Sequence, residues 1–208
     1  MHMSWADLLH LGDLSLTLPA GSAVAAWLLA GRAWRAALGW SLVFGLALAL
    51  VAASKIAFMG WATGLPALHF KAFSGHATGF TAVFPTLCWL VARSGGQRAP
   101  QASRAPPLAA GAALALAAVV AAALVHAGEH TLSEAVSGWI IGAAVFACAV
   151  RLASPTAPPL PATAVACAAL AFLVTAWTIR SAPVGYWMIK VALVLSGNSA
   201  PHELDHCG

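Results

Sequence analysis

Two short polar clusters interrupt an otherwise apolar chain, and their residue types suit phosphoryl transfer. The first cluster reads Phe73-Ser74-Gly75-His76, and the second runs over 126–134 as His-Ala-Gly-Glu-His-Thr-Leu-Ser-Glu. Each cluster lies at the end of a long apolar segment. Two histidines, a hydroxyl and a carboxylate on one membrane face would supply a nucleophile, a proton donor and phosphate-binding groups.

Ser74 directly precedes an apolar segment and is expected to cap a helix that begins there. Serine is favoured at this position because its side-chain oxygen accepts a backbone N–H of the first turn. The remaining free amides of the first turn, including that of Gly75, form a ready anion site. His76 falls in the same turn, close to any bound anion. The simpler interpretation is an ordinary cap with a histidine directed to the lipid headgroups.

His130 and Glu134 are four residues apart, so one face of a helix can bring imidazole and carboxylate together. The carboxylate would hold one tautomer of His130 and make the other ring nitrogen a better nucleophile. Thr131 and Glu134 also form the pattern of a capping box, which predicts a helix start at this point. The two roles of Glu134 are compatible.

Two lysines are candidate phosphate ligands. Lys55 lies near the end of an apolar segment, at the end closest to both clusters. Its side chain can hold a phosphate oxygen there, or extend to the headgroups. Lys71 precedes Ser74 by three residues. Its simpler interpretation is that the side chain is solvated and binds no phosphate.

The composition determines the setting of these residues. Of the 208 residues, 61% are hydrophobic and 8% are charged, whereas soluble domains carry about 25% charged residues. We therefore expect an all-α integral membrane protein, with a bundle of about six transmembrane helices. The predicted spans are 14–31, 36–59, 75–93, 107–126, 133–151 and 162–179.

We expect one membrane domain over 1–208. Residues 1–13 would form an interfacial N-terminal segment, 14–179 the six-helix core, and 180–208 a C-terminal interfacial segment and tail. The loops after the first, third and fifth spans carry Arg residues, which makes them cytoplasmic by the positive-inside rule. Both clusters then face the other side, which is the periplasm for the inner membrane of a bacterium. The net charge of +4 reflects these loops and predicts no nucleic-acid partner.

The order Lys55, then Ser74-Gly75-His76, then His130-x-x-x-Glu134 resembles the motifs of the type 2 phosphatidic acid phosphatase superfamily, over 55–142. The resemblance implies a metal-independent lipid phosphatase without a cofactor. In it, His130 would form a phosphohistidine, Glu134 would orient His130, and His76 would be the general acid. Ser74 and the Gly75 amide would bind phosphoryl oxygens, and Lys55 would neutralise their charge.

The chain departs from the family pattern at both phosphate-binding arginines. Ala62 and Thr63 stand where the family has Arg-Pro, and Leu124 stands at the third-motif Arg position. A guanidinium binds phosphate through a directional fork that lysine does not reproduce. His126 and Lys71 are the candidates to compensate.

Three functions follow from these residues. The first is a membrane phosphatase that hydrolyses a lipid phosphate or pyrophosphate, with membrane lipids as its partners. The loss of the arginines favours the second, a non-catalytic protein that binds a phospholipid or polyprenyl phosphate. The third is a zinc hydrolase that uses His126-x-x-Glu129-His130 on a helix, with His69 or His76 as a further ligand. The substrate and the oligomeric state stay open.

Overall fold

The computed structural model describes residues 12–96, 105–153 and 162–203. In this part of the chain the secondary structure is helical, apart from one isolated β-bridge between Leu65 and Phe70. The all-α prediction is therefore confirmed. The elements are α2 (Leu14–Ala30), α3 (Trp34–Trp61), the short 3-10 helix η2 (Pro66–Leu68), α4 (Gly75–Gly96), α5 (Ala105–His126), α6 (Leu132–Ala153), α7 (Ala162–Arg180) and α8 (Val184–Ser196).

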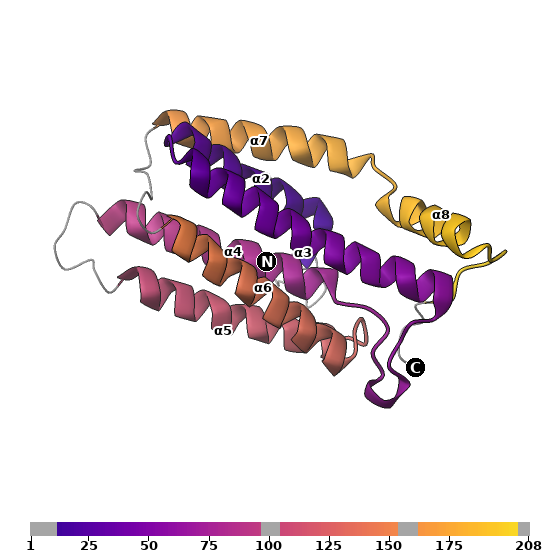
Figure 1. Cartoon of the computed structure of the whole chain (residues 1–208). Helices are drawn as coiled ribbons and strands as arrows, with labels where there is room; N and C mark the ends of the chain where they lie inside the picture. Colours follow the sequence, from indigo (N-terminus) through magenta and orange to yellow (C-terminus); the bar gives the residue numbers. More distant parts are fainter. Residues whose placement is uncertain (1–11, 97–104, 154–161, 204–208) are drawn as a thin grey trace, which may run out of the picture.

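Six long helices, α2 to α7, run side by side as one bundle (Figure 1). Each coincides with one of the six predicted spans to within a few residues. Within the described residues, four helices are long and apolar enough to cross a membrane: α3, the part of α5 over Pro107–His126, α6 and α7. The shorter α2 and the less apolar α4 belong to the same bundle, and their crossing of the membrane stays a prediction.

The surface of α3 shows why this bundle suits a lipid environment. Leu38, Leu42, Leu46 and Leu50 recur every fourth residue and are about half or more exposed. The opposite face of α3 is buried, with Trp40 stacked on Phe44. A stripe of exposed leucines of this length is not compatible with water and is typical of a lipid-facing helix.

Helix α4 occupies the centre of the bundle, in contact with α2, α3, α5 and α6. Its buried polar residues are Thr78, Thr81 and Thr86. The Thr78 and Thr86 hydroxyls donate to the backbone carbonyls of Ser74 and Ala82, four residues earlier. Two of the three hydroxyls are thus satisfied within the helix, whereas the buried Thr81 hydroxyl has no hydrogen-bond partner among the described residues.

Two glycines bring α6 against α4. A Cβ atom on Gly138 would lie 2.7 Å from the Ser74 carbonyl oxygen, and one on Gly142 would lie 2.7 Å from that of Thr78. Small residues four apart let two helix backbones touch, as at many membrane helix contacts. This packing places the start of α6 beside the start of α4, where the two polar clusters lie.

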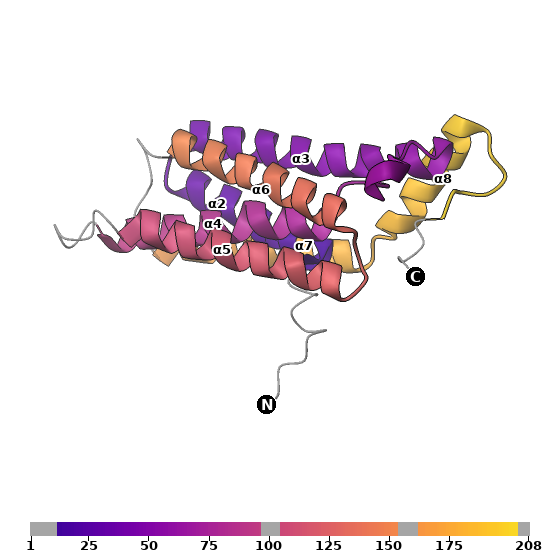
Figure 2. The ribbon, with the colours of Figure 1, turned by 90° about the horizontal axis from the view of Figure 1, so that it is seen from below.

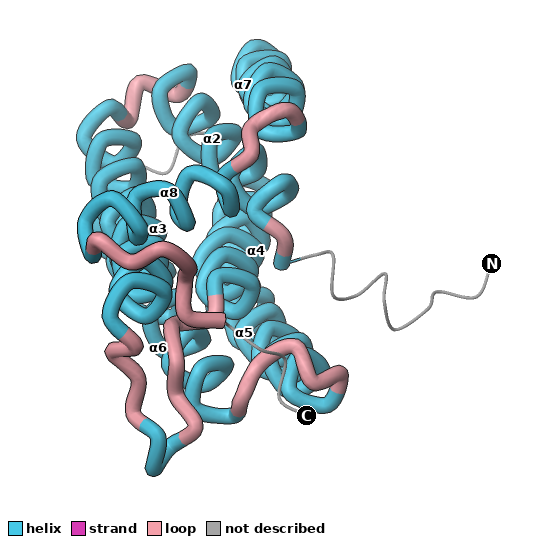
Figure 3. The backbone as a smooth tube through the Cα atoms, turned by 90° about the vertical axis from the view of Figure 1, so that its right-hand side faces the viewer, coloured by secondary structure: helices cyan, strands magenta, loops and turns pink. Residues whose placement is uncertain are grey.

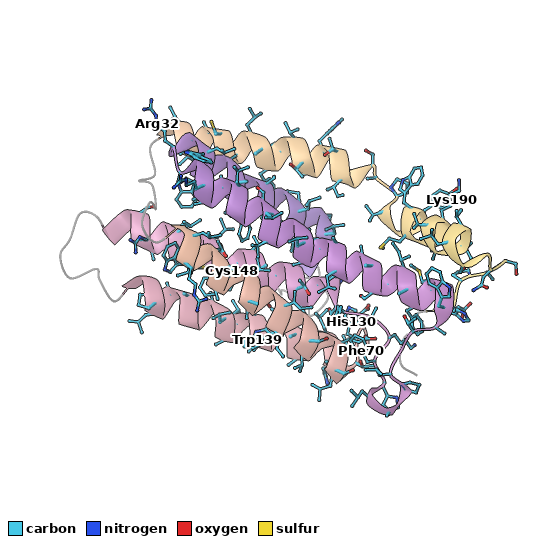
Figure 4. The ribbon with its side chains drawn as sticks, viewed as in Figure 1. Arg32, Phe70, His130, Trp139, Cys148 and Lys190 are labelled. Atoms are coloured by element: carbon cyan, nitrogen blue, oxygen red, sulfur yellow. The ribbon has the colours of Figure 1, made fainter. Side chains whose placement is uncertain are left out.

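The connections from α3 to α4, α5 to α6 and α7 to α8 lie at one end of the bundle, which faces the viewer in Figure 3. His130 lies near this end and Arg32 at the opposite one (Figure 4). Helices α4 and α6 also finish at the Arg32 end, with Arg93 and Arg151 in their last turns. The loop between α4 and α5, with Arg98 and Arg104, lies outside the described residues.

The predicted C-terminal interfacial segment contains α8, which lies beside the end of α3 (Figure 2). Asn198 donates its side-chain amide to the Gly60 carbonyl at 2.7 Å, and the His202 amide donates to the Met59 carbonyl at 2.9 Å. The tail is thus attached to α3. Residues 1–11 of the predicted N-terminal segment and residues 204–208 lie outside the described part.

Candidate active site

The carboxylate of Glu134 is buried, with 7% of the residue exposed, and it organises the site. Its Oε2 accepts hydrogen bonds from His130 Nδ1 at 3.1 Å and from the Thr131 amide at 3.3 Å. Its Oε1 accepts from the Lys71 amide at 3.0 Å and from the Ala72 amide at 3.4 Å. Four donors therefore converge on one carboxylate, which stabilises its charged form in a buried setting.

The capping box and the histidine pair exist together, as expected for compatible roles. Glu134 donates its amide to the Thr131 hydroxyl at 3.4 Å while its side chain returns to the Thr131 amide. However, the expectation that His130 and Glu134 share a helical face is wrong. Helix α6 begins at Leu132, so His130 lies before it. The carboxylate reaches His130 because the cap turns it back over the helix start.

The loop before His130 is set by the end of α5. Gly128 has a φ of +75°, the left-handed conformation that suits glycine after a helix. The amides of Glu129 and His130 both donate to the Leu124 carbonyl, at 3.1 and 3.3 Å. These bonds close α5 and turn the chain back, so that His130 lies over the starts of α4 and α6.

Ser74 is the N-cap of α4, as predicted. Its hydroxyl oxygen accepts the Ala77 amide at 3.2 Å, and its side chain is fully buried. The Ser74 amide donates to the Glu134 carbonyl oxygen at 3.3 Å, which ties the starts of α4 and α6 together. The first-turn amides of Gly75 and His76 lack carbonyl partners within the helix, as at any helix start.

The two histidines face each other across the site. The ring centroids of His76 and His130 are 6.0 Å apart, with an angle of 59° between the ring planes. Since Nδ1 of His130 contacts Glu134, Nε2 of His130 is the ring nitrogen left to act as a nucleophile. A phosphoryl group bound between the rings can therefore meet a nucleophile on one side and a proton donor on the other.

A groove of about 570 Å³ reaches this site from the side. Asp13, Lys55, Gly75 and His76 line its polar part. Apolar side chains from four helices line the remainder: Leu18 of α2, Leu48 of α3, Ile179 of α7 and Met188 of α8. One opening thus combines a cation and a helix start with an apolar surface, which suits a molecule that has a phosphate at one end and hydrocarbon at the other.

The other predicted ligands lie differently. Lys71 is half-buried, and its backbone amide donates a hydrogen bond to Glu134 at the site. His126 is exposed in the last turn of α5. Leu124, at the family's arginine position, is 1% exposed and packs with Ala77 and Ala135. The Leu124 side chain therefore belongs to the core and does not reach the site.

The zinc interpretation needs His126, Glu129 and His130 on one continuous helix. The structure ends α5 at His126 and places Gly128 in the left-handed region, so this helix does not form. Across 12–96, 105–153 and 162–203, no group of three His, Cys, Asp or Glu side chains is close enough to hold a metal ion.

One acidic residue was missed by the sequence argument. Asp13 precedes α2, and its Oδ1 lies 3.3 Å from Nε2 of His76. The signal for it was weak, since an Asp before an apolar helix reads as a cap. Alternating topology nevertheless places the start of α2 at the membrane face of the two clusters.

Two comparisons with known proteins give a match. The PAP2 superfamily model matches residues 57–156, which include His76, His130 and Glu134. The chain is 34% identical over 158 residues to an uncharacterized 22.5 kDa protein in the cps region of Klebsiella pneumoniae, covering 76% of this chain and 73% of that protein. No solved structure gives a significant match.

Proposed function

This chain belongs to the PAP2 superfamily, whose members are generally phosphatases, and from that premise we propose that it hydrolyses a lipid phosphate or pyrophosphate in the membrane. The observation that carries the proposal is the His130–Glu134 pair, at 3.1 Å, with the ring of His76 across from it at 6.0 Å. A protein that only bound phosphate would need neither an oriented nucleophile nor a second imidazole facing it.

The proposed reaction has two steps. Nε2 of His130 attacks phosphorus, a P–N bond forms, and the P–O bond to the leaving group breaks. The electron pair goes to the leaving oxygen, which takes a proton from His76. A water molecule then attacks phosphorus and gives a proton to His76, so that a new P–O bond forms as the P–N bond breaks. Glu134 holds the N–H of His130 throughout.

The residues around the rings support binding of the transferred group. The first-turn amides of α4, at Gly75 and His76, and the cation of Lys55 border one groove. Phosphoryl transfer depends on positioning and charge stabilisation, which these groups offer. The Ser74 hydroxyl is buried beneath them, and its remaining donor can point to a phosphoryl oxygen.

The apolar groove supports a lipid as the substrate. Its polar part holds Lys55 and His76, and its apolar part is formed by α2, α3, α7 and α8. The lipid phosphate would enter from the bilayer with its chains still in hydrocarbon. The Arg residues at the far end support an inner-membrane orientation with the site towards the periplasm.

The test is phosphate release by the purified protein in detergent, with EDTA present. The panel holds phosphatidate, phosphatidylglycerol phosphate and undecaprenyl pyrophosphate. Release should survive EDTA and fall at least about 1,000-fold in His130→Ala, which removes the nucleophile. His202→Ala is the matched control, because His202 is exposed on the tail at the same end, and within the described residues it bonds only through its backbone amide. Retained turnover in His130→Ala would exclude it as the nucleophile.

A second candidate is non-catalytic binding of a lipid phosphate, which is favoured by the burial of Leu124 where the family has arginine. In that case the wild-type protein would bind the lipid phosphates of the panel and release phosphate from none. Binding by His130→Ala would then equal that of the wild type, because no covalent step is involved.

A further inference from the structure

We propose that Asp13 is a positioning residue for His76, so that the site contains two carboxylate–imidazole pairs, one for the nucleophile and one for the proton donor. The inference rests on the proposed phosphatase function and goes beyond it, because it assigns a residue outside the matched family region of 57–156. Its central observation is the distance of 3.3 Å between Asp13 Oδ1 and His76 Nε2.

The backbone at the start of α2 is held against His76. Gly12 is buried, and a Cβ atom on it would lie 2.8 Å from the Cβ of His76. One turn further along, a Cβ on Gly79 would lie 2.8 Å from the Thr17 hydroxyl oxygen. These two close approaches, one at Gly12 just before α2 and one at Thr17 within α2, hold the start of α2 against α4 and set the position of Asp13 relative to His76.

The backbone of Asp13 is itself anchored. Its carbonyl accepts from the amides of Leu16 and Thr17, at 3.0 and 2.8 Å, and from the Thr17 hydroxyl at 3.0 Å. Because the carbonyl is held by three donors of its own helix, the carboxylate is presented from a rigid point. Such rigidity is what a group that orients a catalytic side chain requires.

The ordinary explanation for an Asp at this position is helix capping, and the geometry does not support it. Asp13 is the N-cap residue of α2, yet its side chain makes no cap hydrogen bond. A capping carboxylate would turn towards the amides of its own first turn. Here the carboxylate is directed to the imidazole of another helix instead.

The charges around His76 explain what the Asp13–His76 contact would do. Among the described residues, the charged and titratable groups that face His76 are Asp13, His130, Lys55 and Glu129. Lys55 repels an imidazolium at His76, and the carboxylate in contact with the ring offsets that repulsion. With Nε2 held by Asp13, Nδ1 is the nitrogen left to protonate the leaving oxygen. After that transfer, Nε2 keeps its proton and Nδ1 can accept the proton of the attacking water.

The test compares leaving groups. A substrate with an alkyl leaving group, dioctanoyl phosphatidate, needs its leaving oxygen protonated, whereas the activated aryl ester p-nitrophenyl phosphate does not. Asp13→Asn should lower kcat on the alkyl substrate by about 10- to 100-fold, a fraction of what a positioned acid contributes. It should change kcat on the aryl substrate and KM on both by less than about 3-fold on the same principle. Asp13→Glu should restore part of the loss, and Ser15→Ala, exposed in the same turn, should show none.

A second comparison asks whether Asp13 acts through His76. His76→Ala should show the same preference for aryl leaving groups. In the His76→Ala background, Asp13→Asn should cause no further loss of kcat. Equal losses of Asp13→Asn on alkyl and aryl substrates, or losses that multiply with those of His76→Ala, would overturn the positioning role and leave the phosphatase intact. No release by the wild type from either substrate would instead overturn the phosphatase itself, and the role of Asp13 with it.

Folding is controlled separately. If Asp13→Asn does not fold, the test uses ¹⁵N NMR spectra of the histidine rings in the wild-type protein. The His76 signals are assigned as those that disappear in His76→Ala. The proposal expects the His76 proton on the nitrogen that faces Asp13. A mixture of both tautomers in exchange would overturn it.

Discussion

The imidazole ring of His76, in the first turn of α4, faces that of His130, just before α6, at 6.0 Å between centroids. Two glycine contacts between α6 and α4 bring these starts together. The Ser74 amide then bonds the Glu134 carbonyl at 3.3 Å across the same interface. The chemistry of the site thus depends on a helix packing that lies below it, towards the middle of the bundle.

The dual role of Glu134 predicts losses in both rate and stability for Glu134→Gln. A Gln side chain has one acceptor oxygen, so two of the four donors that now face the carboxylate would meet an amide NH₂. We expect the rate to fall about 100- to 10,000-fold, as when a triad carboxylate is neutralised. We also expect about 1–3 kcal/mol lower stability from the unsatisfied donors. Steady-state kinetics and denaturant unfolding in detergent measure the two effects.

Thr131→Ala is the matched control for that prediction. It removes the hydroxyl that accepts the Glu134 amide and leaves the His130–Glu134 pair in place. Thr131→Ala should lower the free energy of unfolding by about 1 kcal/mol, as for other N-caps, and should leave the rate within a few-fold of the wild type. A large loss of rate in Thr131→Ala would mean that the cap, not the carboxylate charge, positions His130.

Gly138→Ala should reduce activity indirectly, by changing the helix packing next to the site. The added Cβ would lie 2.7 Å from the Ser74 carbonyl oxygen, so α6 must move away from α4. We expect a loss of about 1–3 kcal/mol from overpacking, together with a lower kcat because the two histidines separate. Gly45→Ala on α3 is the control, since its Cβ would meet nothing within 4 Å. Unchanged activity in Gly138→Ala would show that the site tolerates this displacement.

Leu48→Trp should select against long lipid chains. Leu48 lines the apolar part of the groove, and a larger side chain would fill it. We expect KM for long-chain lipid phosphates to rise about 10-fold, the order expected when a pocket loses apolar contacts. KM for a short soluble phosphate ester should stay the same. Leu46→Trp, on the exposed face of the same helix, should have neither effect. Equal KM changes on short and long substrates would exclude this groove as the lipid path.

The orientation of the bundle can be read from labelling. Ser199 is exposed on the tail at the site end, and Arg32 is exposed at the other end. In a variant without its four cysteines, Ser199→Cys should react with a membrane-impermeant maleimide in intact spheroplasts. Arg32→Cys should react only after the membrane is opened, because loops with Arg stay cytoplasmic. The reverse pattern would place the site on the cytoplasmic side.

The local sequence determined the membrane setting, the helices and their starts. Apolar segments separated by Pro, Gly and Arg predicted α2 to α7, because burial of backbone polar groups in lipid requires helices. Ser74 and the Thr131–Glu134 box were readable as caps because a cap is made among neighbouring residues. The candidate pair of His130 and Glu134 was readable for the same reason, although not the position of His130 before α6.

Only the tertiary structure decided which groups meet across helices. The amides of Lys71 and Ala72 reach Glu134, and the Asp13 carboxylate reaches His76, through contacts between segments far apart in the chain. Such contacts follow from how closely α4 approaches α6 and α2, which is set by the absence of side chains at Gly138 and Gly79. No pattern among neighbouring residues records these distances, because packing between helices depends on all the side chains that meet there.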